Sequence, residues 1–210
     1  MLMKSDGYDN YAPSLDTQMM ERCIRLSEIS IEQGELPFGA LICRDEAIVA
    51  ETTNQVINDA DITRHAEIVA ISKAQKILGH RDLTGCTLYS TVEPCVMCAY
   101  AVREARVSRV VFSIRSPLMG GLSKWNVLRD SELSHHLPEV FGSVPEVVSG
   151  LLRREAERVW SAWNPLFWSA IKFNGYMGGE EKSDCSHLPA IPGRRGLLRR
   201  IFALHGRRHA

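Results

Sequence analysis

The chain has 210 residues, of which 45% are hydrophobic and 24% charged, and its 25 basic side chains balance 25 acidic ones. This length suits one domain with short appendages. The composition is that of a globular protein with a hydrophobic core, and it excludes a chain too polar to fold. No apolar run approaches the ~20 residues that a membrane-spanning helix needs. The start, MLMKSDG, lacks the basic-then-apolar order of a signal peptide. We therefore expect a cytoplasmic protein whose six cysteines are reduced thiols or metal ligands.

Apolar periodicity predicts the first elements in chain order. Residues 16–33 carry apolar side chains at helical spacing, and Gly34 follows as a stop signal. Residues 37–51, PFGALICRDEAIVAE, predict two strands joined by a tight turn at residues 44–46. After a polar loop, residues 65–78 predict a helix that Gly79 closes in a left-handed conformation.

The second half of the chain continues this alternation. We predict a strand over residues 87–92, a helix over 95–105 and a strand over 109–114 that is apolar enough to be covered on both faces. A long insertion, residues 115–145, precedes a last strand and a last helix, 146–150 and 151–163. Strands alternating with helices after a hairpin predict an α/β protein, a three-layer α/β/α sandwich with a mixed sheet.

Composition divides the chain into three parts: an N-terminal arm (residues 1–15), the main domain (16–175), and a flexible linker with a basic tail (176–210). From Ser186 onward there are six arginines and no acidic residue, which leaves 19 basic against 25 acidic side chains before it. Residues 193–209 of this tail are compatible with a short basic helix. Such a tail fits a contact with nucleic-acid phosphates, a contact with an anionic membrane, or an inert solvated segment, and these alternatives stay open.

Two cysteines in the stretch STVEPCVMCAY suggest a metal site. Cys95 and Cys98 come too late in the chain for the redox pair of a thioredoxin-like fold, and no second Cys pair supplies the four ligands of a structural zinc site. The pattern favours an open zinc site of two thiolates, one imidazole and a water molecule. His65 is the best imidazole candidate, because helix N-termini meet at the carboxyl edge of an α/β sheet.

Glu67 lies two residues beyond His65, where its carboxylate is placed to exchange protons with a zinc-bound water. Taken alone, each of these residues has an ordinary explanation. A His or Glu at a helix start is usually a capping or surface residue, and two cysteines one turn apart are often core residues. Their joint order, spacing and placement at helix starts favour the catalytic interpretation.

His65-Ala66-Glu67 followed by Pro94-Cys95-Val96-Met97-Cys98 resembles the signature of the zinc-dependent cytidine deaminase superfamily, over about residues 16–170. PFGA, AIVAE and KAQKILG resemble bacterial guanine deaminases, whereas TLYSTVEPCVMCA and SRVVFSIRS resemble the tRNA adenosine deaminases that act on the wobble base. The residues 117–130 fit neither branch and predict a pocket lid peculiar to this chain.

The resemblance assigns roles to seven residues. It implies Zn²⁺ held by His65, Cys95 and Cys98, with Glu67 as the catalytic proton shuttle. It further implies a base-binding site made by Asn54, Phe38 and the backbone around Ala66.

The implied reaction replaces an exocyclic amine of a nucleobase or nucleoside by a carbonyl and releases ammonia. We expect a guanine-like purine first, because residues 161–171 lack the arginines with which the tRNA enzymes grip the anticodon stem. The alternative is deamination of the wobble adenosine of tRNA. A second alternative is a nucleic-acid-binding protein without turnover, against which the intact Glu67 argues.

Further expectations concern partners and aromatic residues. The resemblance predicts a homodimer with a small-molecule substrate, and RNA as a less favoured partner. Trp160 is predicted to lie in the core or in a dimer contact, and Trp163 and Trp168 to close the pocket. Glu93 is predicted either to hold a loop or to support the metal site.

Overall fold

The computed structural model, which describes residues 13–178, contains a five-stranded sheet in the order β2-β1-β3-β4-β5. Strand β1 is antiparallel to both β2 and β3, whereas β3, β4 and β5 are parallel, so the prediction of a mixed sheet is confirmed. The strands are β1 (Gly39–Arg44), β2 (Ala47–Thr53), β3 (Cys86–Val92), β4 (Arg109–Ile114) and β5 (Glu146–Ser149).

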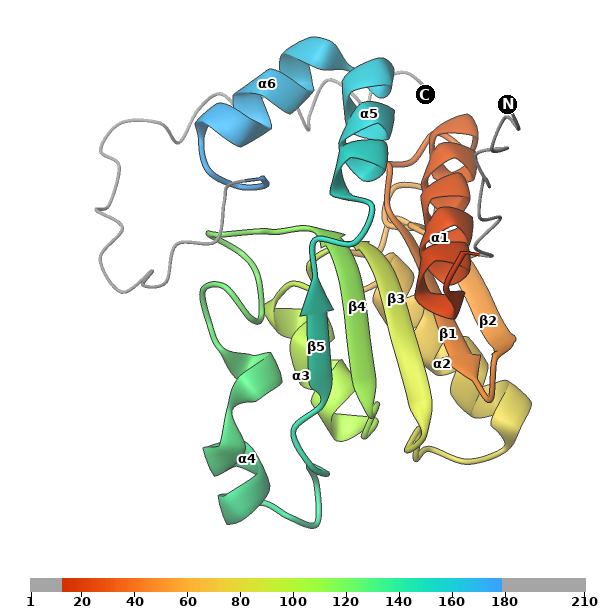
Figure 1. Cartoon of the computed structure of the whole chain (residues 1–210), viewed down its shortest axis with the longest axis vertical. Helices are drawn as coiled ribbons and strands as arrows, with labels where there is room; N and C mark the ends of the chain where they lie inside the picture. Colours follow the sequence, from red (N-terminus) through yellow and green to blue (C-terminus); the bar gives the residue numbers. More distant parts are fainter. Residues whose placement is uncertain (1–12, 179–210) are drawn as a thin grey trace, which may run out of the picture.

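Helices cover both faces of this sheet (Figure 1). Helices α2 (Ala66–Leu78) and α3 (Val96–Glu104) pack on one face, and α1 (Leu15–Glu32) and α5 (Arg153–Trp163) pack on the other. Because side chains alternate along a strand, each strand contributes to two separate apolar cores. Leu88 and Val110 face α2 and α3, whereas their neighbours Tyr89 and Val111 face α1 and α5. The three-layer α/β/α sandwich is therefore confirmed.

The hairpin turn has the backbone that a two-residue connection requires. Asp45 and Glu46 have φ angles of 48° and 66°, and Arg44 pairs with Ala47 across the turn. Two consecutive left-handed residues match the right-handed twist of the strands they join. The predicted left-handed stop of the next helix is also present, since Gly79 has a φ of 74°.

The insertion between β4 and β5 is more regular than expected. It contains a 3₁₀ turn (Val127–Arg129) and the short helix α4 (Ser131–His136). The guanidinium of Arg103, which is 1% exposed, donates to the carbonyl oxygens of Val127 and Asp130 at 2.8 Å and to the hydroxyl of Ser134 at 2.6 Å. The sequence pattern did not predict these elements because a distant buried side chain holds them.

A second helix, α6 (Pro165–Phe173), follows α5 and was also missed. Asn164 caps it, because its side-chain oxygen accepts a hydrogen bond from the amide of Phe167 at 3.0 Å, and Pro165 takes the first helical position. Asn164 therefore both ends α5 and starts α6. No helix within residues 13–178 is long and apolar enough to cross a membrane.

Asp16 joins α1 to the sheet. Its carboxylate accepts two hydrogen bonds from Arg109 at 2.7 and 2.8 Å, and one from the hydroxyl of Tyr89 at 2.6 Å. The Arg109 guanidinium, helped by Tyr89, holds the pKa of Asp16 below its usual value. A lowered folded-state pKa stabilises the protein at neutral pH, and this stabilisation is lost as the pH falls through that pKa.

We therefore expect Asp16→Asn to lower the free energy of unfolding by about 1.5–3 kcal/mol at pH 7, the range for a hydrogen bond to a charged group. The difference from the parent protein should narrow below about pH 4, where the carboxyl is protonated in the unfolded chain. Urea denaturation at several pH values measures the loss of unfolding free energy at pH 7 and its decrease at low pH. The control Glu155→Gln, whose pair with Arg158 is 41% and 73% exposed, should change stability by less than about 0.5 kcal/mol. A pH-independent loss in Asp16→Asn would contradict the assignment.

Candidate active site

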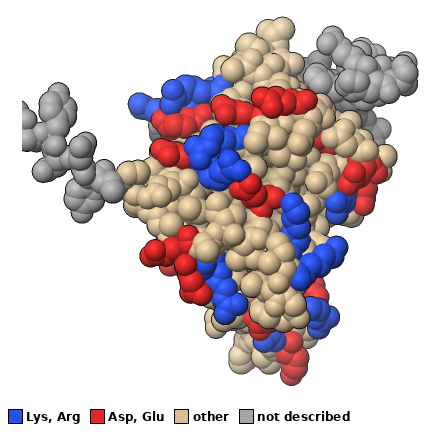
Figure 2. All heavy atoms as spheres, turned by 90° about the vertical axis from the view of Figure 1, so that its right-hand side faces the viewer, with Lys and Arg blue, Asp and Glu red and all other residues tan. Residues whose placement is uncertain are grey.

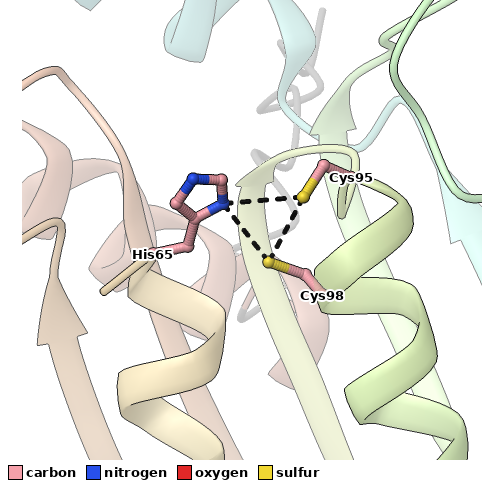
Figure 3. A group of neighbouring side chains, drawn as sticks. All are labelled: His65, Cys95 and Cys98. Carbon is pink, nitrogen blue, oxygen red and sulfur yellow. Dashed lines mark hydrogen bonds between the residues drawn. The ribbon is translucent and has the colours of Figure 1, made fainter. Parts of the chain in front are cut away.

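His65 and the two cysteines meet at the N-termini of two neighbouring helices. His65 is the residue before α2, and Cys95 is the residue before α3. The Nδ1 atom of His65 lies 3.5 Å from each of the Cys95 and Cys98 sulfur atoms, which are 3.6 Å apart (Figure 3). These three residues form a group whose ligand atoms all lie within 4.8 Å of one another.

This triangle fits a zinc ion. Tetrahedral zinc with Zn–S bonds of about 2.3 Å and Zn–N bonds of about 2.0–2.1 Å needs ligand atoms roughly 3.5–3.8 Å apart. The separations between His65, Cys95 and Cys98 are 3.5, 3.5 and 3.6 Å. Two soft thiolates and an imidazole are also the donor set that zinc prefers. Three ligands from the protein leave the fourth position for water or substrate.

The electrostatics of the group favour the thiolate form at Cys95. A hydrogen bond from the Cys98 thiol, together with one from His65, lowers the pKa of Cys95 to about 4. The thiolate is the form that binds a metal ion. The bond to Cys95 in turn raises the pKa of His65.

Glu67 lies in the first turn of α2 and is 5% exposed. Burial, with the neighbouring charge of Cys95, raises the pKa of its carboxyl above the usual value. A carboxyl with a raised pKa holds and releases a proton closer to neutral pH. The hydroxyl of Ser90 donates to the Glu67 carboxylate at 3.3 Å. Ser90 was not predicted, because it is an ordinary polar residue in a strand.

A cavity of about 260 Å³ opens beside these residues, just below the range of ~300–1,000 Å³ for pockets that hold drug-sized ligands. The predicted residues Phe38, Asn54, His65, Glu67 and Cys95 all line it. Its other lining residues are Leu36, Val56, Val92, Glu93, Ser116, Met119, Ile171, Tyr176 and Met177.

Ala66 does not line the cavity with Phe38 and Asn54. Its carbonyl oxygen accepts a hydrogen bond from the hydroxyl of Thr52 at 2.8 Å, and the residue is 1% exposed. A substrate contact through the Ala66 backbone stays a prediction. The prediction that Trp163 and Trp168 close the pocket is wrong. Trp168 packs against Trp160, 5.8 Å between ring centroids, in the core.

The outer wall comes instead from the end of α6 and the residues that follow. Ile171, Tyr176 and Met177 line the cavity here. The carbonyl oxygen of Tyr176 accepts a hydrogen bond from the Ser116 hydroxyl at 2.8 Å, and the amide of Gly178 donates to the carbonyl of Arg115 at 2.9 Å. Residues 176–178 are thus hydrogen-bonded to the start of the insertion.

Glu93 holds that insertion against the site. Its buried carboxylate accepts hydrogen bonds from the amides of Ser116, Leu122 and Ser123 at 2.8, 3.0 and 2.6 Å, and from the Ser123 hydroxyl at 2.7 Å. A Cβ atom on Gly120 would collide with this carboxylate. Of the two roles predicted for Glu93, holding a loop is the one that these contacts support.

Glu35 is a site residue that sequence reasoning missed. It lies between α1 and β1, is 2% exposed, and accepts a hydrogen bond from the side-chain amide of Asn54 at 2.8 Å. A single acidic residue just after a helix stop has no distinctive pattern. Its one sequence clue is its position two residues before PFGA, residues 37–40.

Comparison with known proteins gives consistent results. Residues 13–114 match the family model described as the cytidine and deoxycytidylate deaminase zinc-binding region. The tRNA-specific adenosine deaminase of Agrobacterium fabrum is 32% identical over 139 residues, which cover 66% of this chain and 91% of that protein. That of Aquifex aeolicus is 38% identical over 115 residues, 54% of this chain and 76% of the relative.

Solved structures of two kinds resemble the fold. A structure from a study of tRNA:A34 deaminases is 32% identical, with a TM-score of 0.59 over 68% of this chain and 99% of that one. A structure from a study of guanine deaminase from Nitrosomonas europaea is 26% identical, with a TM-score of 0.56 over 71% of this chain and 84% of that one.

Proposed function

This chain belongs to the zinc-dependent cytidine deaminase superfamily, and we propose that its substrate is a free purine base or nucleoside, a guanine-like purine first. As a member of this family it is a hydrolytic deaminase with a zinc-binding domain. Relatives of both kinds, guanine deaminases and tRNA adenosine deaminases, are similar to it, so the choice of substrate rests on the cavity itself.

The lining of the cavity is the observation that carries this proposal. No Lys or Arg is among the residues that line it in the described part of the chain. Its outer wall is apolar, with Met119, Ile171 and Met177 beside the aromatic ring of Tyr176. A nucleotide within tRNA carries phosphates, which proteins contact mainly with Lys and Arg. An apolar rim of this kind suits a flat, uncharged base.

The charges on one face of the molecule agree with a small substrate. On the face that carries α1 and the edge strand β2, Lys and Arg side chains are interspersed with Asp and Glu (Figure 2). The pairs Arg22–Glu51 and Arg44–Asp45 lie in this region. This face therefore lacks the continuous basic stripe typical of nucleic-acid binding.

The proposed mechanism gives each side chain one task. Zinc, held by His65, Cys95 and Cys98, would acidify a water molecule at the open position. Glu67 would take a proton from the water and deliver it to the ring nitrogen beside the reacting carbon. It would then take the remaining proton of the oxygen added to that carbon and pass it to the departing amine, so that ammonia leaves as the carbonyl forms. Asn54 orients the base. The buried, apolar surroundings exclude bulk water, which strengthens each of these electrostatic contacts.

Deamination of the wobble adenosine of tRNA is the second candidate. It is supported by the names of the curated relatives, tRNA-specific adenosine deaminases. The six arginines that follow Ser186 are a source of phosphate contacts, although they lie outside the described residues. A nucleic-acid-binding protein without turnover has less support, because binding alone needs no buried carboxyl such as Glu67 beside the metal site.

Ammonia release by the full chain, screened over free bases, nucleosides and tRNA, separates the two candidates. We expect turnover of guanine or a related purine, and no turnover of tRNA. A variant that ends before Ser186 should keep its activity on the small base. Turnover of tRNA alone, lost in the truncated variant, would overturn the proposal. In that case binding to tRNA should also weaken with salt, by about 0.9 log units per log unit of salt for each duplex phosphate contact.

Two further proposals concern assembly and extent. We propose a homodimer that uses the outer face of α3, where Val96 and Tyr100 lie one turn apart and are 43% and 44% exposed. We also propose that the catalytic domain extends beyond residue 175, since Tyr176 and Met177 line the cavity. The cytoplasmic location stays a prediction.

A further inference from the structure

The buried carboxylate of Glu35 accepts three hydrogen bonds. One oxygen accepts from the Nδ2 atom of Asn54 at 2.8 Å, and the other accepts from the backbone amides of Ile57 and Asn58, each at 2.8 Å. Both Glu35 and Asn54 are buried, at 2% and 3% exposed. One acidic side chain therefore joins the end of α1 to the loop that follows β2 and to a side chain that lines the cavity.

This contact determines which way the Asn54 amide points. The oxygen and nitrogen of an asparagine side chain have nearly the same shape, so only the hydrogen-bond partners distinguish its two orientations. An ionised carboxylate accepts hydrogen bonds and does not donate them. The Asn54 atom beside Glu35 must therefore be the nitrogen, and the oxygen, Oδ1, lies on the other side of the amide.

Oδ1 of Asn54 has no hydrogen-bond donor from the protein within residues 13–178, although the residue is 3% exposed and lines the cavity. Oδ1 is not among the fully buried side-chain atoms that lack a partner in the described residues, so it is accessible from the cavity. A bound molecule that covers Oδ1 must offer an N–H or O–H group at this point, because an acceptor that is buried without a partner is costly. The protein thus presents an acceptor, in one fixed orientation, to whatever enters the cavity.

We propose that Glu35 is a positioning residue that fixes the polarity of Asn54, so that the site selects ligands with a hydrogen-bond donor on the edge facing Oδ1. This inference deepens the proposed function, since it takes Asn54 as a contact of the substrate base. Guanine-like purines carry ring N–H and amino groups that meet this requirement. A base with only acceptors on that edge leaves Oδ1 unpaired and binds more weakly.

Glu35→Gln tests the proposal with little change of shape. The amides of Ile57 and Asn58 need an acceptor, so the new side-chain oxygen faces them and its NH₂ group faces Asn54. Asn54 then turns its oxygen toward that NH₂ group and presents its own NH₂ to the cavity. We expect KM for the best substrate to rise roughly 10-fold, the loss of about one hydrogen bond, while kcat changes less than about 3-fold.

A double-mutant cycle separates positioning from general support of the loop. Asn54→Ala should raise KM on its own, and adding Glu35→Gln to it should then cause no further rise, because the second residue acts through the first. The matched control is Asn58→Ala, which removes a 3.1 Å bond from the same loop to the carbonyl of Gln33 without touching Asn54. It should leave KM unchanged. Equal losses from Glu35→Gln in both backgrounds would overturn the proposal.

A second measurement does not depend on turnover. In a ¹⁵N NMR spectrum of the zinc-loaded protein, the side-chain amide of Asn54, assigned by its disappearance in Asn54→Ala, should shift in Glu35→Gln and stay in place in Asn58→Ala. An unchanged Asn54 signal in Glu35→Gln would show that Glu35 does not set this orientation. Failure of all bases to react, with the NMR shift present, would instead count against the proposed function alone.

Discussion

Replacing His65 or Cys95 by alanine should reduce the zinc content from about one ion per chain to near zero. Three protein ligands, whose donor atoms lie 3.5–3.6 Å apart, hold the ion. Among the described residues no further His, Cys, Asp or Glu belongs to this group, so no other side chain can replace a lost ligand. Metal analysis of the purified proteins measures the effect. Deaminase activity should be lost together with the metal.

Cys43→Ala is the matched control for these variants. Cys43 is a buried thiol of β1 that packs in the core beneath α1, outside the metal group. Its replacement should leave the zinc content unchanged. Full zinc occupancy in both His65→Ala and Cys95→Ala would mean that the ligands lie elsewhere in the chain.

Glu67→Gln should separate metal binding from proton transfer. The amide has the shape of the carboxyl and accepts the hydrogen bond from Ser90, so the fold and the three ligands are preserved. It cannot take up and release a proton, and turnover should fall by roughly 10²-fold or more. We expect kcat to carry the loss while the zinc content stays at the level of the parent protein.

The control here is Glu104→Gln, which changes an exposed carboxylate at the end of α3 that does not line the cavity. It should turn over substrate at the parent rate. If Glu67→Gln also keeps the parent rate, Glu67 is only a residue that suits the start of a helix, and another group moves the proton.

The elements that the sequence predicted are those that carry their own local signal. Helices α1 and α2 have apolar periodicity and a terminal glycine, and β4 lies within the predicted bounds, residues 109–114. The metal group could also be predicted from the sequence, because the positions of His65 and Cys95 before two helices bring them together at one edge of the sheet.

The parts that were missed depend on contacts between distant residues. Helix α4 is held by the buried guanidinium of Arg103, and Glu93 holds the loop that begins at Ser116. The role of Glu35 depends on Asn54, 19 positions away. The pocket wall at Tyr176 and Met177 lies beyond the point where the composition changes. No local pattern encodes such contacts, so only the folded chain reveals them.

The two buried anchors of the insertion have a consequence for the evolution of substrate range. Glu93 fixes Ser116, Leu122 and Ser123 at one end, and Arg103 fixes the carbonyl of Val127 at the other. Between the first anchor points, Met119 reaches the cavity. Both anchors belong to the stretch that also supplies the cysteine ligands. We therefore expect substitutions at residues 117–119 to change the outline of the cavity while the two anchors and the metal ligands stay in place. Such a separation lets the substrate range of a protein change over evolution without loss of its metal site.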